Sequence, residues 1–329
     1  MSDQPETPSN SRNSHENVGA KKADANVGAK KADANVASKF RSLHISETTK
    51  PLTSTRALYK TTRNNSRGAT EFHKHVCTLA WKYLACIDKS SISHIEIEMK
   101  FGVITDKRTH RRMTPHNKPF IVQNRNGRLV SNVPEQMFSS FQELLRSKSE
   151  NPSKCAPRVV KQVQKYTKDS IYNCNNASKV GKLTSWRCSE DLRNKELKLT
   201  YIKKVRVKDF LIRYPQSSLD AKISISLEVP EYETSAAFRN GFILQRTKSR
   251  STYTFNDKMP LHLDLTKITT TRRNSHQYTS HEVEVEMDPI FKETISANDR
   301  EKFNEYMCSF LNASDLIRTA AERDNMLTT

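Results

Sequence analysis

Strict alternation of apolar and polar residues dominates the second half of the chain, from about residue 182 onward. Successive side chains of a β-strand point to opposite faces of a sheet, so a repeat of two predicts strands. Turn-forming residues separate the alternating stretches, as is typical of antiparallel strands joined by short loops. The predicted strands are 94–105, 182–189, 195–214, 221–230, 241–255, 260–271 and 281–289.

Three other stretches follow the period of an α-helix, with apolar residues recurring every three to four positions. They are 70–87, 134–149 and 298–324. The apolar stripe of the last one consists of Phe303, Met307, Leu311 and Leu316. Residues 150–182 are polar and are predicted to form loop or short strands. The pattern therefore predicts an α+β fold dominated by antiparallel strands, with flanking helices.

The N-terminal part lacks both periods. Residues 1–68 are rich in Ser, Asn, Lys and Thr, and the sequence NVGAKKADA occurs twice in tandem, at 17–25 and 26–34. A nine-residue copy is too short for a solenoid repeat and indicates a duplication in an unfolded segment. We therefore expect a disordered basic tail over 1–68 and one folded domain over 69–329.

The polar faces of the predicted strands are nearly uniform in charge. Glu96, Glu98 and Lys100 share one face of the first strand, opposite an apolar face. The residues that share a polar face in four other strands are Glu282, Glu284 and Glu286, all acidic; Arg246, Lys248 and Arg250, all basic; His262, Asp264 and Thr266; and Ser185, Arg187 and Ser189. Both a sheet with a solvated face and a barrel with a polar interior give such alternation. Because neighbouring glutamates repel each other, the ladders favour an interior where cations compensate them.

Carboxylates without clustered Cys or His suit a hard cation, Mg²⁺ or Mn²⁺. A facing row of Arg and Lys suits phosphate oxygens. Acids that hold a metal opposite bases that hold phosphate are the usual arrangement for phosphoryl transfer. The formal net charge of +19 and the pI of about 9.7 also indicate a polyanionic partner.

Several classes of protein are excluded by composition. Seven glycines provide no P-loop or dinucleotide fingerprint. Six cysteines without a CxxC pair suggest free thiols in a reducing compartment. Without an apolar run of about 20 residues or a signal peptide, we expect an intracellular protein, in the nucleus, the cytoplasm or both, and no membrane partner.

Two motifs, ExExKFG at 96–102 and ExExE at 282–286, resemble those of the fungal metal-dependent RNA 5′-triphosphatases. That family belongs to the triphosphate tunnel metalloenzymes and includes the β subunit of yeast mRNA-capping enzymes. The resemblance covers about residues 69–317. It implies an eight-stranded antiparallel β-barrel that encloses a hydrophilic tunnel, so that 69–329 would be the catalytic domain.

The resemblance also implies roles for single residues. Glu96, Glu98 and Glu286 would ligate Mg²⁺ or Mn²⁺ directly, and Asp264 and Glu284 would hold metal-bound waters. Arg187, Lys248 and Arg250 would grip the γ-phosphate, and Glu228 would orient or deprotonate the attacking water. The supporting residues are Lys100, Phe101, which would pack outside the tunnel, Thr266 and Glu282.

By the same resemblance, the activity would be hydrolysis of the γ–β phosphoanhydride of 5′-triphosphate RNA, giving 5′-diphosphate RNA and orthophosphate. Nucleoside triphosphates or polyphosphate would be further substrates, particularly with Mn²⁺. Capping-enzyme relatives form homodimers. They also carry a Trp-bearing peptide that tethers the guanylyltransferase, and such a tether is not evident here, because Trp81 and Trp186 are the only tryptophans.

One position departs from the family pattern RxDxT, which reads His262-Leu-Asp264-Leu-Thr266 in this chain. A histidine there lacks the permanent charge of arginine. Two alternatives stay open on the residues alone: an inorganic polyphosphatase of the same fold, and a non-catalytic RNA-binding protein. The RNA-binding alternative would use the basic loops 107–113 and 269–275.

Overall fold

The computed structural model describes most of the chain after residue 69. The described residues are 70–113, 117–123, 126–150, 159–172, 184–215, 217–235, 238–239, 241–255, 260–272 and 277–327. The predicted tail over 1–68 lies outside them. No helix within the described residues is long and apolar enough to cross a lipid bilayer.

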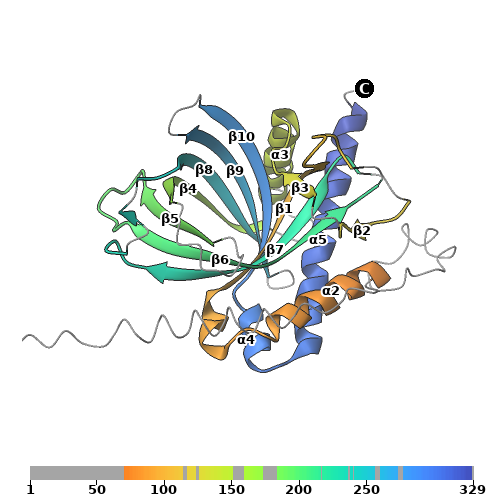
Figure 1. Cartoon of the computed structure of the whole chain (residues 1–329). Coiled ribbons are helices and arrows are strands. Elements are labelled where there is room, and N and C mark those ends of the chain that lie inside the picture. The colour runs from red at the N-terminus through yellow and green to blue at the C-terminus, as the bar shows by residue number, and fades with distance from the viewer. Residues whose placement is uncertain are drawn as a thin grey trace, which may run out of the picture. The chain divides into compact units, whose positions relative to one another are not determined.

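Eight antiparallel strands form a closed barrel (Figure 1). They are β1 (Ile95–Asp106), β4 (Val159–Tyr172), β5 (Thr184–Asp191), β6 (Thr200–Arg213), β7 (Asp220–Glu231), β8 (Leu244–Phe255), β9 (Leu261–Arg272) and β10 (Tyr278–Met287). Their order around the barrel is β10-β9-β8-β4-β5-β6-β7-β1, and pairing of β1 with β10 closes it. Two short strands lie off this ring: β2 (Phe120–Ile121) pairs with β6, and β3 (Gly127–Val130) pairs with β1.

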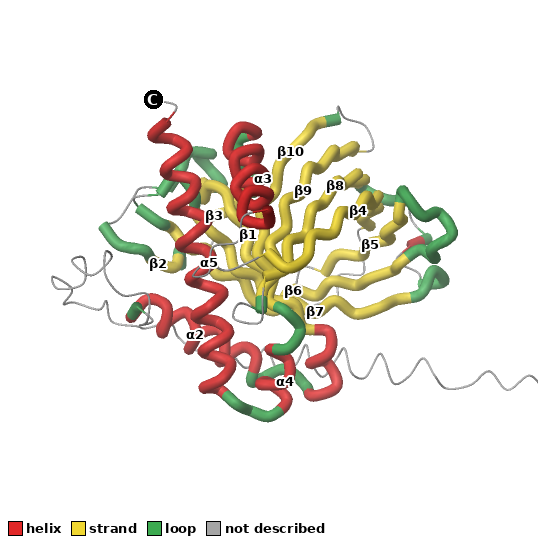
Figure 2. The backbone as a smooth tube through the Cα atoms, turned by 180° about the vertical axis from the view of Figure 1, so that it is seen from behind, coloured by secondary structure: helices red, strands yellow, loops and turns green. Residues whose placement is uncertain are grey.

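Helices flank the barrel. They are α2 (Glu71–Leu84), the 3₁₀ helix η2 (Lys89–His94), α3 (Glu135–Glu150), α4 (Phe291–Ser296) and α5 (Arg300–Leu327). Thr70 caps α2, because its hydroxyl accepts a hydrogen bond from the His73 amide at 3.1 Å. Figure 2 shows α5 running along one side of the strands, with α2 and α4 near their lower ends. The predicted α+β barrel with flanking helices is confirmed.

The core lies between the outward faces of the strands and the helices. Ile97, Met99 and Phe101 of β1 are fully buried there, as are Phe303 and Phe310 of α5. Apolar side chains therefore cover the outside of the barrel, which leaves the alternate, polar positions to its interior.

Two predictions from the sequence were wrong. The region 150–182, predicted as loop or short strands, contains the 14-residue strand β4 within the barrel. It shows no apolar face because part of its outer surface, including Gln162 and Gln164, is exposed. On α5, Leu316 is 56% exposed, and Ile317, which is 8% exposed, continues the buried stripe.

Gly102, the last residue of the ExExKFG motif, lies where β1 leaves the barrel and pairs with β3. A Cβ atom at this position would lie 2.0 Å from the backbone oxygen of Val130. Real Cβ atoms do not approach a backbone oxygen this closely. The glycine is therefore required by the close approach of the two backbones.

Candidate active site

Alternation along the strands places the charged residues of the motifs inside the barrel. On β1 and β10 the register brings Glu98 opposite Glu286 and Lys100 opposite Glu284. On β9 and β8 it brings Thr266 opposite Arg250 and Asp264 opposite Thr252. Two acidic strands that are distant in sequence thus become neighbours, and basic strands lie around the same interior.

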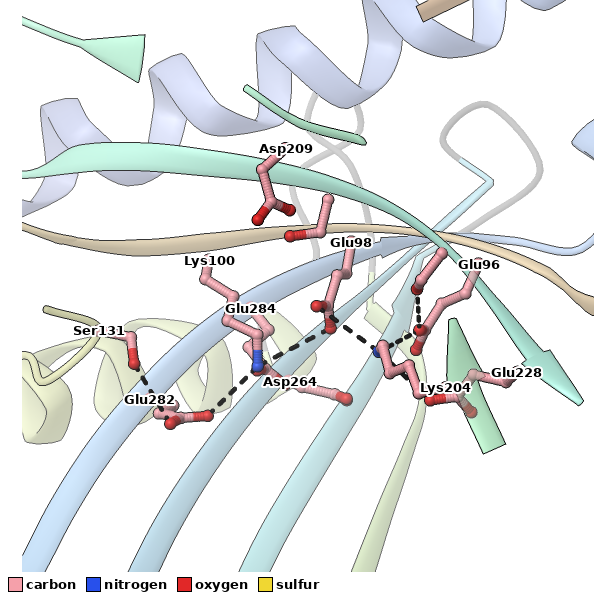
Figure 3. Close-up of polar contacts among 12 residues, drawn as sticks. Glu96, Glu98, Lys100, Ser131, Lys204, Asp209, Glu228, Asp264, Glu282 and Glu284 are labelled. Carbon is pink, nitrogen blue, oxygen red and sulfur yellow. Dashed lines mark hydrogen bonds and ion pairs between the residues drawn. The ribbon is translucent and has the colours of Figure 1, made fainter. Parts of the chain in front are cut away.

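Lys204 of β6 lies among three interior carboxylates (Figure 3). Its ammonium group pairs with Glu96, lies 3.6 Å from Glu98 and lies 3.2 Å from Glu228. Burial disfavours the charged lysine, but the three carboxylates outweigh burial and raise its pKa. Lys204 therefore neutralises much of the acidic ladder at this end of β1.

Lys100 compensates a second group of carboxylates, two residues after Glu98 on β1. It pairs with Glu284, and its Nζ lies 3.5 Å from Glu282 and 3.8 Å from Glu98 (Figure 3). Burial opposes ionisation of Glu284, yet Lys100 and Arg250 hold its pKa well below the usual value. Glu284 is therefore an ionised carboxylate fixed between two cations.

Arg250 of β8 joins two predicted site residues. Its guanidinium lies 2.7 Å from Asp264 and 3.3 Å from Glu284. The Thr252 hydroxyl donates to Asp264 at 2.6 Å. Asp264 and Glu284, both predicted to hold metal-bound waters, are therefore held together by one guanidinium.

Arg187 of β5 donates to both carboxylate oxygens of Glu228 at 3.3 Å. Burial raises the pKa of Glu228, but Arg187 and Lys204 lower it more, so the net shift is downward. The residue predicted to grip phosphate and the residue predicted to handle water are thus direct partners.

Lys248 of β8 is buried and lies 2.5 Å from Asp169 of β4. Burial lowers its pKa to about 8, and the positive charges of Arg246, Arg250 and Arg187 contribute, while Asp169 opposes them. A phosphate oxygen near Lys248 would favour its charged form. The cation-rich wall of β8 and β5 is therefore suited to phosphate.

Glu286 differs from the other glutamates of the two ladders. No hydrogen bond or ion pair to its carboxylate occurs within the described part of the chain. Burial raises its pKa to about 8, and the like charges of Glu96, Asp264 and Glu98 add to the shift, while Arg250 opposes them. Negative charge around Glu286 therefore exceeds the positive charge that the protein supplies there.

This excess charge and the oxygen-only donors suit a hard divalent cation. The predicted ligands are Glu96, Glu98 and Glu286, of which Glu98 and Glu286 are register partners. Among the described residues, however, no three His, Cys, Asp or Glu side chains are arranged to hold a metal ion. The Lys204 ammonium engages Glu96 and Glu98 in this arrangement, so a metal held by both carboxylates would compete with Lys204 for them.

The remaining predicted residues also have clear positions. Phe101 is fully buried on the outer face of β1. Thr266 is fully buried in the interior, and its hydroxyl has no hydrogen-bond partner among the described residues. His262, at the position that departs from the family pattern, lies 3.3 Å from Asp288 and 3.2 Å from the Thr254 hydroxyl. Glu282 accepts a hydrogen bond from Arg246 at 2.6 Å and one from Ser131 at 3.3 Å.

Several charged residues of the interior were not predicted from the sequence, among them Lys204, Arg206, Asp169 and Lys222. Lys204 and Arg206 alternate within 195–214, so the strand pattern could have identified Lys204. Lys222 lies within the predicted strand 221–230, but the sequence pattern gave it no role. Asp169 lies in the strand that was missed, and its sequence offers no signal.

Comparison with known proteins gives matches along most of the chain. Residues 66–323 match the family described as the mRNA capping enzyme, beta chain. A Saccharomyces cerevisiae protein named polynucleotide 5′-triphosphatase CTL1 is 96% identical over 329 residues, covering 100% of both chains. The mRNA-capping enzyme subunit beta of Candida glabrata is 27% identical over 250 residues, covering 72% of this chain and 40% of that protein.

Solved structures share the barrel. The S. pombe Pct1 RNA triphosphatase matches with a TM-score of 0.61 and 21% identity, covering 76% of this chain and 93% of that chain. At this identity the likeness supports the fold, and the residues of the interior carry the chemistry.

Proposed function

Because the chain belongs to the family of the mRNA capping enzyme β chain, we propose that it is a polynucleotide 5′-triphosphatase. It hydrolyses the γ–β phosphoanhydride of a 5′-triphosphate RNA end and releases orthophosphate. The observation that carries the proposal is the closed interior, in which the paired glutamates Glu98 and Glu286 share one tunnel with Arg187, Lys248 and Arg250.

In this mechanism the basic wall positions the γ-phosphate. Arg187 and Arg250 provide planar guanidinium groups that donate two hydrogen bonds in parallel, which matches phosphate oxygens. Lys248 adds a charge that phosphate stabilises. When substrate enters, these cations exchange part of their contact with Glu228, Asp264 and Asp169 for contact with phosphate. The interior is therefore preorganised for a terminal phosphate group, which carries two negative charges when fully ionised.

Glu228 is the proposed group that orients the attacking water and accepts its proton. Its pKa is lowered while Arg187 and Lys204 neutralise it, so it enters the reaction as a carboxylate. Engagement of Arg187 by the γ-phosphate weakens that neutralisation and makes Glu228 more basic. Substrate binding thus activates the base, because the same Arg187 side chain binds the γ-phosphate and neutralises Glu228.

Glu96, Glu98 and Glu286 are the proposed ligands of Mg²⁺ or Mn²⁺, with Asp264 and Glu284 as hydrogen-bond acceptors for its waters. A bound divalent cation would neutralise charge that builds up on the phosphoryl oxygens. Lys204 compensates Glu96 and Glu98 when the cation is absent, so it keeps the acidic ladders compatible with a folded barrel.

The test is orthophosphate release from triphosphate-ended RNA, GTP and tripolyphosphate, each with Mg²⁺, with Mn²⁺ and with EDTA. The expected result is metal-dependent release from RNA, which Glu96→Gln and Glu286→Gln abolish. A protein that binds RNA but releases no phosphate under any condition would instead be the non-catalytic RNA-binding protein. Release from tripolyphosphate alone would indicate an inorganic polyphosphatase.

A further inference from the structure

A strongly basic extension continues β1 beyond the barrel. We call it the basic wing and define it as residues 103–113 and 126–130. Its basic residues are Lys107, Arg108, Arg111, Arg112 and Arg128, and Asp106 is its single acidic residue. In both views of the fold, β3 and the far end of β1 lie on the side of the strands where α5 runs (Figures 1 and 2).

Backbone hydrogen bonds define the turn of the wing. The Asp106 amide donates to Arg111 O at 2.9 Å, and the His110 amide donates to Asp106 O at 2.9 Å. The Asp106 carboxylate accepts the amides of Arg108 and Thr109 at 2.8 and 3.0 Å. The one negative charge of the wing is therefore directed at its own backbone.

The basic side chains differ in how they are held. Arg112 is anchored, since it donates to Ser217 O at 2.8 Å and lies 3.3 Å from Asp220. Arg128 donates to Nδ1 of His110 at 3.0 Å, and His110 has a φ of 58°, unusual for a residue other than glycine. Arg108 and Arg111 are exposed, and no carboxylate of the described residues forms an ion pair with either. Positive charge is thus concentrated at the tip.

The wing continues from the part of β1 that holds Lys100. Lys222 lies opposite Lys100 in the register of β7 and β1, and Arg206 lies 2.8 Å from Ser224 beside them. Carboxylates compensate two of these cations, since Lys100 pairs with Glu284 and Arg206 pairs with Asp209. At the opposite end, Lys204 and Arg187 compensate Glu96 and Glu228. A substrate chain that leaves the tunnel along β1 meets the exposed cations of the wing, which attract a polyanion.

The length of β1 determines how many nucleotides separate the tunnel from the wing. Lys100 and Asp106 are six residues apart, which is about 20 Å along a strand. A stacked nucleic-acid strand advances about 3.4 Å per nucleotide, so about six nucleotides span this distance. We propose that Arg108 and Arg111 bind backbone phosphates of the RNA that follows the 5′-triphosphate. This inference rests on the proposed function and adds a subsite outside the tunnel.

The test compares Arg108→Gln/Arg111→Gln with the control Lys195→Gln/Lys198→Gln. The control removes the same charge from the exposed turn between β5 and β6, at the end of the tunnel opposite to the wing. For a 20-nucleotide triphosphate RNA, kcat/KM of the wing variant should fall about tenfold at low salt. The slope of log kcat/KM against log salt concentration should become about 1.4 less negative, because two phosphate contacts are lost. GTP, which is too short to reach the wing, should be hydrolysed as by the unmodified chain.

The inference is overturned if the wing variant hydrolyses RNA normally, if RNA and GTP turnover fall equally, or if the control variant alone loses RNA turnover. Affinity for the same RNA in EDTA, measured without turnover, separates this inference from the proposed function. A chain that releases no phosphate yet loses RNA affinity in the wing variant would refute the activity and retain the RNA contact.

Discussion

Glu98 and Glu286 lie directly opposite each other at the closure of the barrel, although 188 positions separate them in the sequence. The two carboxylates are compensated very differently. Glu98 lies near Lys100 and Lys204, whereas no ion pair among the described residues reaches Glu286. The closure therefore concentrates uncompensated negative charge on β10, at the place where a divalent cation is proposed to bind.

Replacing Glu286 with Gln should abolish activity and increase the stability of the fold. Its pKa is raised to about 8 in the folded chain, against an ordinary value of 4.5, so the folded state binds the proton more tightly than the unfolded state. Ionisation therefore costs stability as the pH rises from about 4.5 to about 8. In EDTA, the free energy of unfolding of Glu286→Gln should exceed that of the unmodified chain by about 4 kcal/mol at pH 8, with little difference at pH 4.5.

Chemical denaturation at the two pH values measures this effect, and phosphate release checks that the same variant is inactive. Glu293→Gln, on the exposed side of α4, is the control and should change neither quantity. An equal or lower stability of Glu286→Gln at pH 8 would contradict the view that its charge is uncompensated.

Lys204→Gln should make the stability of the fold depend on metal. Without the ammonium group, Glu96, Glu98 and Glu228 repel each other, and loss of one partner of a buried ion pair costs about 3 kcal/mol. A divalent cation should recover much of that loss, so the rise in Tm on adding Mg²⁺ should be larger in the variant than in the unmodified chain. Calorimetry with and without Mg²⁺ tests this, and a variant with unchanged stability in EDTA would contradict it.

Deprotonation of Lys248 should reduce activity at high pH. Its pKa in the free protein is about 8, so above this pH the phosphate wall loses one positive charge. The kcat/KM for triphosphate RNA should therefore fall above about pH 8, approaching tenfold per pH unit. Lys248→Arg keeps its charge at these pH values, and its profile should stay flat there. Identical profiles for the two proteins would show that another group sets the limit.

Gly102→Ala should destabilise the chain strongly, because the new methyl group would lie 2.0 Å from Val130 O in backbone that cannot move independently. Overpacking of this kind costs about 1–3 kcal/mol or more. Gly127→Ala is the matched control, since its nearest neighbours are flexible side chains at 3.2–3.4 Å. Denaturant unfolding of both variants should show the larger loss at Gly102.

Alternation made most of the fold predictable, because seven of the eight barrel strands bury one face and leave the other polar. The strand β4 was missed for the opposite reason: Gln162 and Gln164 leave its outer surface partly exposed, so no regular apolar face marks it. Uniform charge on the acidic and basic strands indicated which faces turn inward, whereas the roles of single residues rest on the family resemblance and stay predictions. Residue pairs such as Lys248 with Asp169 could not be predicted, since they depend on the order of strands around the barrel, which the sequence pattern does not contain.

Closure of the barrel by β1 and β10 also has a consequence for biosynthesis. The proposed metal ligands lie on the first and the last barrel strand, so a nascent chain lacks the complete site until residue 287 has left the ribosome. Fragments that end before β10 would carry an open barrel with an exposed acidic ladder and two unpaired strand edges. Catalytic competence therefore arises in one late step, and prematurely terminated chains should be inactive and prone to edge-to-edge association.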